Sequence, residues 1–189
     1  SLTRLIALEM LCENKVDGHS CGECEMCREI KDNLLFSDNG STASNVLEVD
    51  VANDGGKSAV EKIMEEMDTE PLFGKYKICI LDECHRLTVG AQNSLLKRLE
   101  EPRAYEVYIL CTTDPDDLLE PIISRCELTL TVKPANINEL VDRLLFICQQ
   151  EDVEVSREAL VAIANAKECN PRESIMLLEG IAKSHDYKV

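Results

Sequence analysis

Four cysteines near the start of the sequence have the residue type and spacing of a metal site. The pattern C-x8-C-x2-C-x2-C is formed by Cys12, Cys21, Cys24 and Cys27. Two C-x2-C pairs that share one cysteine present three thiolates to one ion from a tight turn, and the first cysteine adds a fourth from across the loop. Four sulfur ligands favour tetrahedral Zn²⁺ and leave no position open for a substrate. We therefore predict a structural zinc site in a module of about residues 12–35.

Unrelated buried thiols and disulfide bonds are the alternatives to a metal site. Three cysteines within seven residues (21–27) argue against unrelated thiols. The sequence shows no secretory signal, and six further cysteines are scattered along it, which favours a reducing compartment over disulfides. We therefore expect a cytoplasmic location.

An acidic pair closes one apolar segment of the sequence. Asp82 and Glu83 end the run "KICILDE", which has the composition of a strand buried in a parallel sheet. Ligands bind at the carboxyl edge of such a sheet. One carboxylate there can hold Mg²⁺ on the phosphates of a nucleotide, and the next can polarise an attacking water. The alternative is a strand that simply ends in solvated acids.

Two hydroxyls and an arginine follow the next apolar strand. Thr112 or Thr113, in "CTTDP", can hydrogen-bond an attacking water or a γ-phosphate, although Asp-Pro favours a turn, which explains the segment equally well. Arg125 in "IISRCEL" either pairs with a nearby acid or reaches the phosphate of a neighbouring subunit as an arginine finger.

A second arginine occupies an electrostatically unfavourable place. Arg172 lies in the first turn of the last expected helix, where the helix dipole disfavours a cation. A bound anion such as a phosphate explains that placement. Pairing of this arginine with Glu173 or Glu168 explains it as well.

Strands and helices alternate through the first two thirds of the chain. Apolar runs predict strands at 45–51, 77–83, 106–113 and 127–132, and helical periodicity predicts helices at 1–11, 25–35, 57–70, 90–101 and about 120–126. Polar residues 37–44 and 53–56 are expected to form a loop and a turn. This alternation predicts an α/β fold with a parallel sheet flanked by helices.

After Pro134 the pattern is helical throughout. Helices are expected at 137–150, 156–167 and 170–184, the last with Asn170 and Glu173 as a capping box and Pro171 in its first position. We therefore expect two domains, at 1–134 and 135–189.

Composition limits the possible partners. The chain has 189 residues, with 36 acidic against 20 basic side chains and a formal net charge of −16. That balance argues against autonomous binding to a phosphate backbone, which needs clustered Lys and Arg. No apolar run approaches the roughly 20 residues that span a membrane, so no membrane partner is expected.

The order of these features resembles a known family. The segments "ILDECHRLTVGAQNSLLKRLEEP", "YILCTTDPDDLLEPIISRC" and "CNPRESIMLLEG" are similar to the Walker B, sensor 1 with Ser-Arg-Cys, and sensor 2 segments of the AAA+ clamp-loader ATPases of bacterial DNA polymerase III, gamma/tau type. "SLTRLIALEMLC" looks like the helix that follows their phosphate-binding Gly-Lys-Thr, and the cysteine spacing matches their zinc module. The resemblance covers essentially the whole chain and implies a P-loop NTPase fold with a three-helix lid.

The resemblance implies a role for each candidate residue. Cys12, Cys21, Cys24 and Cys27 would bind structural zinc, and Asp82 would organise magnesium beside a water-activating Glu83. Thr113 (or Thr112) would be sensor 1, Arg125 the finger acting in the adjacent subunit, and Arg172 sensor 2. The implied function is ATP-driven loading of a sliding clamp on primed DNA by a hetero-oligomeric ring or spiral of loader subunits.

Two departures from the family pattern affect these expectations. The phosphate loop G-x-x-x-x-G-K-T is absent from the sequence, so we expect it upstream of Ser1 and expect this stretch alone not to hydrolyse ATP. Cys169 stands where the family usually has glycine before the sensor 2 helix. Two alternatives remain open, a delta-prime-type loader subunit without working ATP machinery and a non-catalytic zinc-bearing scaffold. The intact Asp82–Glu83 pair and Arg172 favour the gamma/tau type.

Overall fold

The computed structural model describes residues 2–35, 45–52, 55–71 and 73–184. The chain divides into two compact units, Ser1–Leu128 and Thr129–Val189, which are described separately below. The predicted polar loop at 37–44 and part of the predicted turn at 53–56 lie outside the described residues.

A parallel sheet of three strands organises the first unit. The strands β1 (Val46–Asp50), β2 (Lys77–Asp82) and β3 (Glu106–Leu110) lie in the order β1-β2-β3. Residues 78–81 of the central strand β2 are all buried, as their unbroken apolar run predicted. The register places Asp82 opposite Asp50, so that both carboxylates lie at the carboxyl edge of the sheet.

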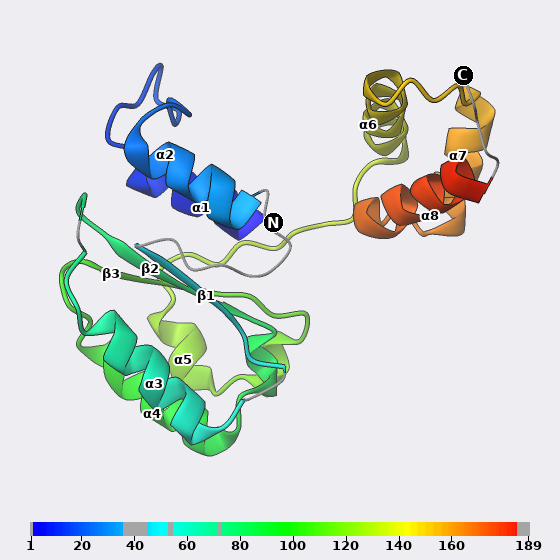
Figure 1. Ribbon diagram of the computed structural model, residues 1–189. Helices are drawn as coiled ribbons and strands as arrows, with labels where there is room; N and C mark the ends of the chain where they lie inside the picture. The colour runs from blue at the N-terminus through cyan, green and yellow to red at the C-terminus, as the bar shows by residue number, and fades with distance from the viewer. Residues whose placement is uncertain (1, 36–44, 53–54, 72, 185–189) are drawn as a thin grey trace. The chain divides into compact units, whose positions relative to one another are not determined.

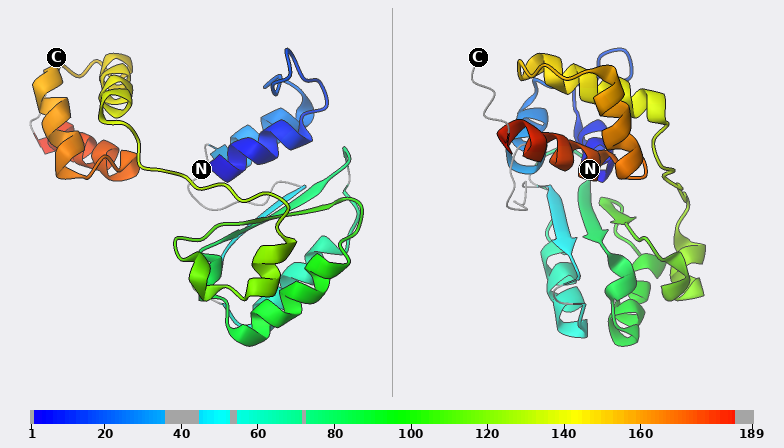
Figure 2. Two further views of the ribbon diagram at one scale, coloured as in Figure 1. Left: turned by 180° about the vertical axis from the view of Figure 1, so that it is seen from behind. Right: turned by 90° about the vertical axis from the view of Figure 1, so that its right-hand side faces the viewer.

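Helices cover both faces of this sheet (Figure 1). The helices α1 (Leu2–Leu11) and α2 (Glu25–Ile30) lie on one face, and α3 (Lys57–Met67), α4 (Val89–Glu100) and α5 (Glu120–Arg125) lie on the other, as the views in Figure 2 also show. Successive side chains of β2 point to opposite faces of the sheet. Ile78 and Ile80 pack with α1 and α2, whereas Cys79 and Leu81 pack with α3 and α4. The predicted α/β arrangement with a parallel sheet is confirmed.

Two predicted elements differ in kind from what the structure forms. The strand expected at 127–132 is not formed, and Leu128, Leu130 and Val132 are 73%, 60% and 74% exposed. Alternating apolar residues satisfy the sequence criterion for a strand, but a strand also needs a backbone partner, and no described strand pairs with this segment. The helix expected at 25–35 continues after α2 as a π-helical turn, Lys31–Leu35.

The second unit contains three described helices, α6 (Ile137–Gln150), α7 (Arg157–Ala166) and α8 (Pro171–Ser184). Their apolar faces form one core that includes Leu144, Leu160 and Leu178. Asn136 and Ser156 cap α6 and α7 through their side-chain oxygens. No helix in the described ranges is long and apolar enough to cross a membrane.

Half of the expected capping box at the start of α8 is present. Asn170 Oδ1 accepts from the Glu173 N–H at 3.3 Å, as predicted. The reciprocal bond is replaced, because the Asn170 N–H donates to the Lys167 carbonyl at 2.8 Å and the Glu173 carboxylate lies 3.6 Å from Lys167 Nζ. The Glu173 side chain therefore lies beside Lys167 and is not part of the helix cap.

Candidate metal centre and candidate nucleotide site

The structure brings the four predicted cysteines together at one point. Their sulfur atoms all lie within 4.8 Å of one another, with 3.7 Å from Cys12 to Cys21 and 4.0 Å from Cys21 to Cys27. Zn–S bonds of about 2.3 Å at tetrahedral angles put the sulfurs about 3.8 Å apart. All four are free thiols. The set therefore fits a single tetrahedral ion.

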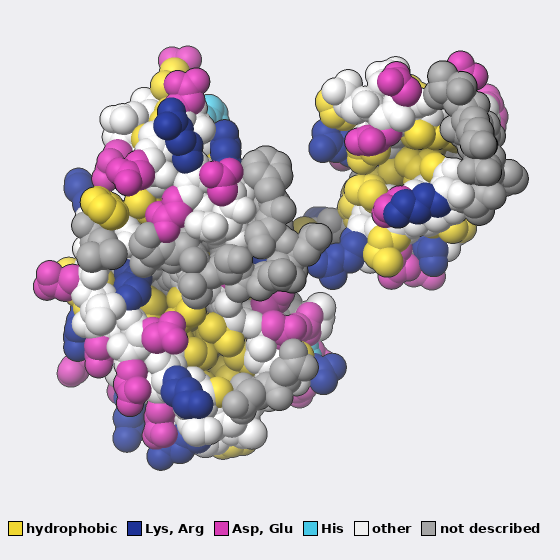
Figure 3. Space-filling model, viewed as in Figure 1, with side chains coloured by type: hydrophobic (Ala, Val, Ile, Leu, Met, Phe, Trp, Pro, Cys, Tyr) yellow, Lys and Arg dark blue, Asp and Glu magenta, His cyan; other side chains and the backbone are white. Residues whose placement is uncertain are grey.

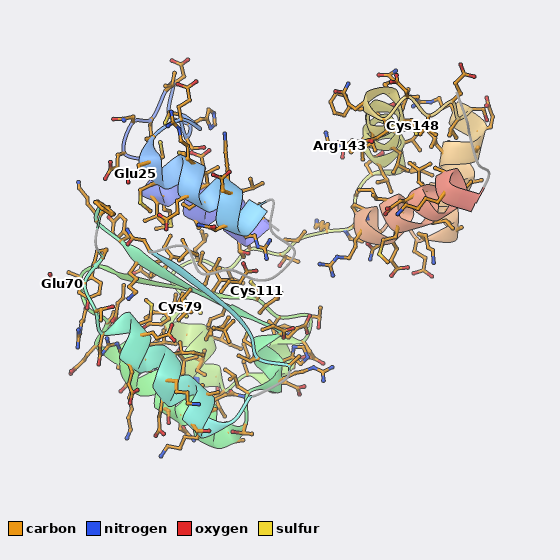
Figure 4. The ribbon with its side chains drawn as sticks, viewed as in Figure 1. Glu25, Glu70, Cys79, Cys111, Arg143 and Cys148 are labelled. Atoms are coloured by element: carbon orange, nitrogen blue, oxygen red, sulfur yellow. The ribbon has the colours of Figure 1, made fainter. Side chains whose placement is uncertain are left out.

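Local folding positions each sulfur. Cys12 follows α1, and Cys24 is the N-cap residue of α2, with Cys27 inside that helix; Figure 4 labels Glu25 at the start of α2. Between them, Asp17 and Gly18 have φ of 52° and 86°, the positive pair that closes a two-residue hairpin. Gly22 has φ of 74°, so the two glycines supply left-handed backbone on either side of Cys21.

Backbone amides make Cys21 a ready metal ligand. The N–H groups of Glu23 and Cys24 donate to Cys21 Sγ at 3.4 and 3.3 Å, and they lower the pKa of that thiol to about 6. Burial instead raises the pKa of Cys27 to about 12. N–H···S bonds of this kind orient a thiolate toward an ion.

The acidic pair lies at the carboxyl edge of β2, as predicted. The chain turns sharply there, because Glu83 adopts left-handed angles (φ 53°, ψ 37°) that a non-glycine residue seldom adopts. The Glu83 N–H donates to Asp82 Oδ1 at 3.1 Å, and the Cys84 N–H donates to the Cys111 carbonyl at 2.9 Å. These bonds fix the turn against the end of β3.

A histidine that sequence reasoning missed links the acidic edge to the threonines. His85 Nδ1 lies 3.5 Å from Glu83 Oε2 and 3.2 Å from Thr112 Oγ1, and its side chain is only 15% exposed. Thr112 Oγ1 also accepts from the Asp114 N–H at 2.9 Å. Of the two candidate threonines, Thr112 therefore joins the cluster, whereas Thr113 is exposed. The only signal for His85 was its place two residues after Glu83.

The thiols around this edge are uncharged. Burial raises the pKa of Cys84 to about 12 and that of Cys111, labelled in Figure 4, to about 11. Both are neutral thiols at neutral pH. The charge of the edge therefore comes from its carboxylates, whose oxygens are the ligands that Mg²⁺ prefers.

The two candidate arginines have different surroundings. Arg125 pairs with Glu100 of its own unit at 2.6 Å and donates to the Pro121 carbonyl, with about a third of its side chain exposed. Arg172 is exposed and enters no ion pair with a described residue. The alternative to an anion site was a pair of Arg172 with Glu173 or Glu168; neither pair is formed among the described residues, and Glu173 lies 3.6 Å from Lys167 instead.

The segment before α8 has the backbone conformation that favours glycine, the residue usual in the resembled family at the position of Cys169. Glu168 and Cys169 have φ of 49° and 58°, two successive left-handed residues. Glycine adopts these angles freely, whereas a cysteine is strained there. Cys169 nevertheless keeps the turn that leads into α8.

Comparison with known proteins first gives the class of fold. The RuvB Holliday junction branch migration motor of Thermotoga maritima superposes with a TM-score of 0.60 at 21% identity, over 71% of this chain and 44% of that chain. The two proteins therefore share their arrangement of sheet and helices over the aligned residues.

Sequence similarity then gives the family. The profile described as "DNA polymerase III, delta subunit" matches residues 1–135, and the chain belongs to this family. The tau subunit of DNA polymerase III from Bacillus subtilis is 34% identical over 179 residues, which are 95% of this chain and 30% of that protein. The tau/gamma subunit from Haemophilus influenzae is 31% identical over 189 residues, which are 100% of this chain and 26% of that protein. The expected relation to DNA polymerase III gamma/tau subunits is confirmed, and the chain spans between a quarter and a third of these relatives.

Proposed function

We propose that this chain supplies part of the ATPase core, and the helical lid, of a gamma/tau-type clamp-loader subunit. The observation that carries the proposal is the cluster at the carboxyl edge of the sheet, where Asp82, Glu83, His85 and Thr112 meet. A parallel sheet binds nucleotides at this edge. The whole protein would use ATP to load a sliding clamp on primed DNA in the cytoplasm.

Each residue of the cluster has a chemical task in this proposal. Bound ATP and magnesium supply the phosphoryl group and the charge that neutralises its oxygens. Asp82 offers carboxylate oxygens toward the metal, and Glu83 orients and polarises the attacking water. Thr112, held by His85, donates toward the water or the γ-phosphate.

The two arginines of one chain would act on the phosphates of two different nucleotides. Arg172 would contact the γ-phosphate from the lid, since a cation in the first turn of α8 is stabilised by a bound anion. Arg125 would act in the adjacent subunit as a finger after leaving Glu100. An exposed ion pair of this kind is worth at most about 1 kcal/mol, so its exchange for a phosphate is easily offset.

The four thiols would hold one structural zinc ion. The tetrahedral fit of the sulfur distances and the N–H···S bonds to Cys21 support this assignment. The partners of the whole protein would be other loader subunits, the clamp and, through the assembly, primed DNA. Lys and Arg side chains are interspersed with Asp and Glu on the face that Figure 3 shows, so that face carries no basic cluster with which the chain would bind DNA on its own.

A delta-prime-type subunit is the second candidate. The matched family carries the description of a delta subunit, and such a subunit would keep the zinc module without hydrolysing ATP. The two candidates differ in whether Glu83 performs chemistry.

ATP turnover by the full-length polypeptide, assembled as the only ATPase subunit of a loader, tests the proposal. Glu83→Gln should lower kcat by about 10² to 10⁴-fold while ATP still binds, since general-base groups contribute about that much. Glu101→Gln, the same chemical change at an exposed position near the end of α4, should leave kcat unchanged. Nucleotide binding without any Glu83-dependent turnover would favour the delta-prime type, and no nucleotide binding would favour the scaffold.

A further inference from the structure

The cysteine cluster contains one distance that local structure alone does not fix. Cys21, Cys24 and Cys27 come from one turn and the first helical residues after it, so their spacing is local. Cys12 directly follows α1, and eight residues separate it from Cys21. A flexible loop of that length would have to be ordered whenever an ion bound, at a cost in affinity.

A carboxylate from α1 closes this loop. Glu9 Oε2 accepts from the Ser20 N–H at 2.8 Å, and Glu9 Oε1 accepts from Ser20 Oγ at 3.0 Å. Both oxygens of one carboxylate thus bind one residue, and His19 Nδ1 lies 3.9 Å from Oε1. Hydrogen bonds to a carboxylate are about twice as strong as neutral ones.

The Glu9–Ser20 contact lies next to two of the four cysteines. Glu9 lies one helical turn before Cys12, and Ser20 directly precedes Cys21. The next amide, that of Cys21, donates to Cys12 Sγ at 3.2 Å. The carboxylate therefore fixes the backbone at the residue where the loop returns to the first sulfur.

The rest of the loop is ordered by its own turn. Val16 and His19 exchange two backbone hydrogen bonds of 2.9 Å around Asp17 and Gly18. This hairpin and the Glu9–Ser20 contact together fold the eight-residue arm using protein atoms alone.

We propose that Glu9 is a positioning residue for the metal centre, whose carboxylate clasps Ser20 and so holds Cys21 beside Cys12 in readiness for the ion. The inference rests on the proposed zinc site and adds a determinant of its affinity outside the four thiols. Groups that orient metal ligands typically change metal affinity by about 10 to 100-fold when removed.

Zinc affinity measured on this chain by competition with a chromogenic chelator tests the clasp. Glu9→Gln should weaken Zn²⁺ binding by about 10-fold or more. Glu13→Gln, the same charge change on an exposed side chain next to Cys12, is the matched control and should bind as the parent does. Ser20→Ala keeps the hydrogen bond from the backbone N–H of residue 20 to Glu9, so it should lose less zinc affinity than Glu9→Gln. In the double variant the two losses of affinity should not add.

Hydrogen exchange in the apo chain separates positioning from simple damage to the helix. Glu9→Gln should speed exchange of the Ser20 amide, while the Cys12 amide, which donates to the Leu8 carbonyl, keeps its protection. If the Glu9 and Glu13 variants bind zinc with equal affinity, the clasp is wrong. It is also wrong if Glu9→Gln loses zinc affinity together with the protection of amides throughout α1 against exchange. If the parent chain binds no zinc, the proposed metal centre itself is wrong and the clasp falls with it.

Discussion

Replacing Arg98 by methionine should destabilise the first unit far more than any surface substitution. The Glu106 side chain opens β3 with no exposed surface, and the guanidinium of Arg98 in α4 contacts both of its oxygens, with Nε at 2.9 Å from Oε2. The only other donor to this carboxylate among the described residues is the Arg103 N–H at 3.2 Å. Removing Arg98 therefore leaves a buried carboxylate with one neutral hydrogen bond.

The size of the effect follows from this geometry. Breaking a buried ion pair by removing one partner costs about 3 to 5 kcal/mol, because the remaining charge stays buried without its counter-ion. Arg98 also binds Asp68 at the end of α3, at 2.6 Å, so the substitution frees that connection too. Glu106→Gln should lower the free energy of unfolding by less than Arg98→Met does, because Arg98 is partly exposed and keeps its ion pair with Asp68. Arg98→Met in the Glu106→Gln background should then cost less than it does alone.

Urea unfolding followed by circular dichroism measures these costs. Arg125→Met is the matched control, because it makes the same substitution at an ion pair of the same unit that is about a third to a half exposed. It should cost at most about 1 kcal/mol. Equal unfolding free energies for the two methionine variants would refute the view that Glu106 depends on Arg98 for its burial.

Three further outcomes are expected. Metal analysis should find about one zinc per chain. Cys12→Ser should abolish zinc binding and speed amide hydrogen exchange first within residues 12–35. If that variant retains zinc, Cys12 is not a ligand. In an assembled loader of full-length subunits, Arg125→Ala should lower ATP turnover by up to about 10³-fold, whereas an unchanged rate would leave the Glu100 ion pair as its only role. His85→Phe should lower kcat by up to about 10²-fold with ATP affinity unchanged, because Thr112 and Glu83 lose their shared contact, and a change in affinity alone would contradict that positioning role.

Elements set by local sequence could be predicted closely. Helix α6 has the expected bounds, and β2 ends one residue before its expected end. Periodicity and capping residues determine such elements within a few turns of chain. The cysteine cluster could be predicted for the same reason, since three of its four cysteines lie within seven residues.

Features that depend on distant partners could not be predicted. The strand expected at 127–132 had the right alternation but no described neighbour to pair with. The pair between Arg98 and Glu106 joins a helix to a strand start, and neither residue carries a local signal of burial. The choice of Thr112 over Thr113 likewise required the position of His85 across the edge of the sheet.

The strained residue at the acidic edge is informative because local rules disfavour it. Glu83 holds left-handed angles that glycine or asparagine would adopt at lower cost, and such strain costs about 1 to 3 kcal/mol. The Cys84–Cys111 backbone bond and the Asp82 carboxylate hold the turn in place. A merely structural turn would be more stable with glycine. The carboxylate of Glu83, a little over a third exposed beside His85, is what glycine would remove, so the strain supports the chemical role proposed for this position.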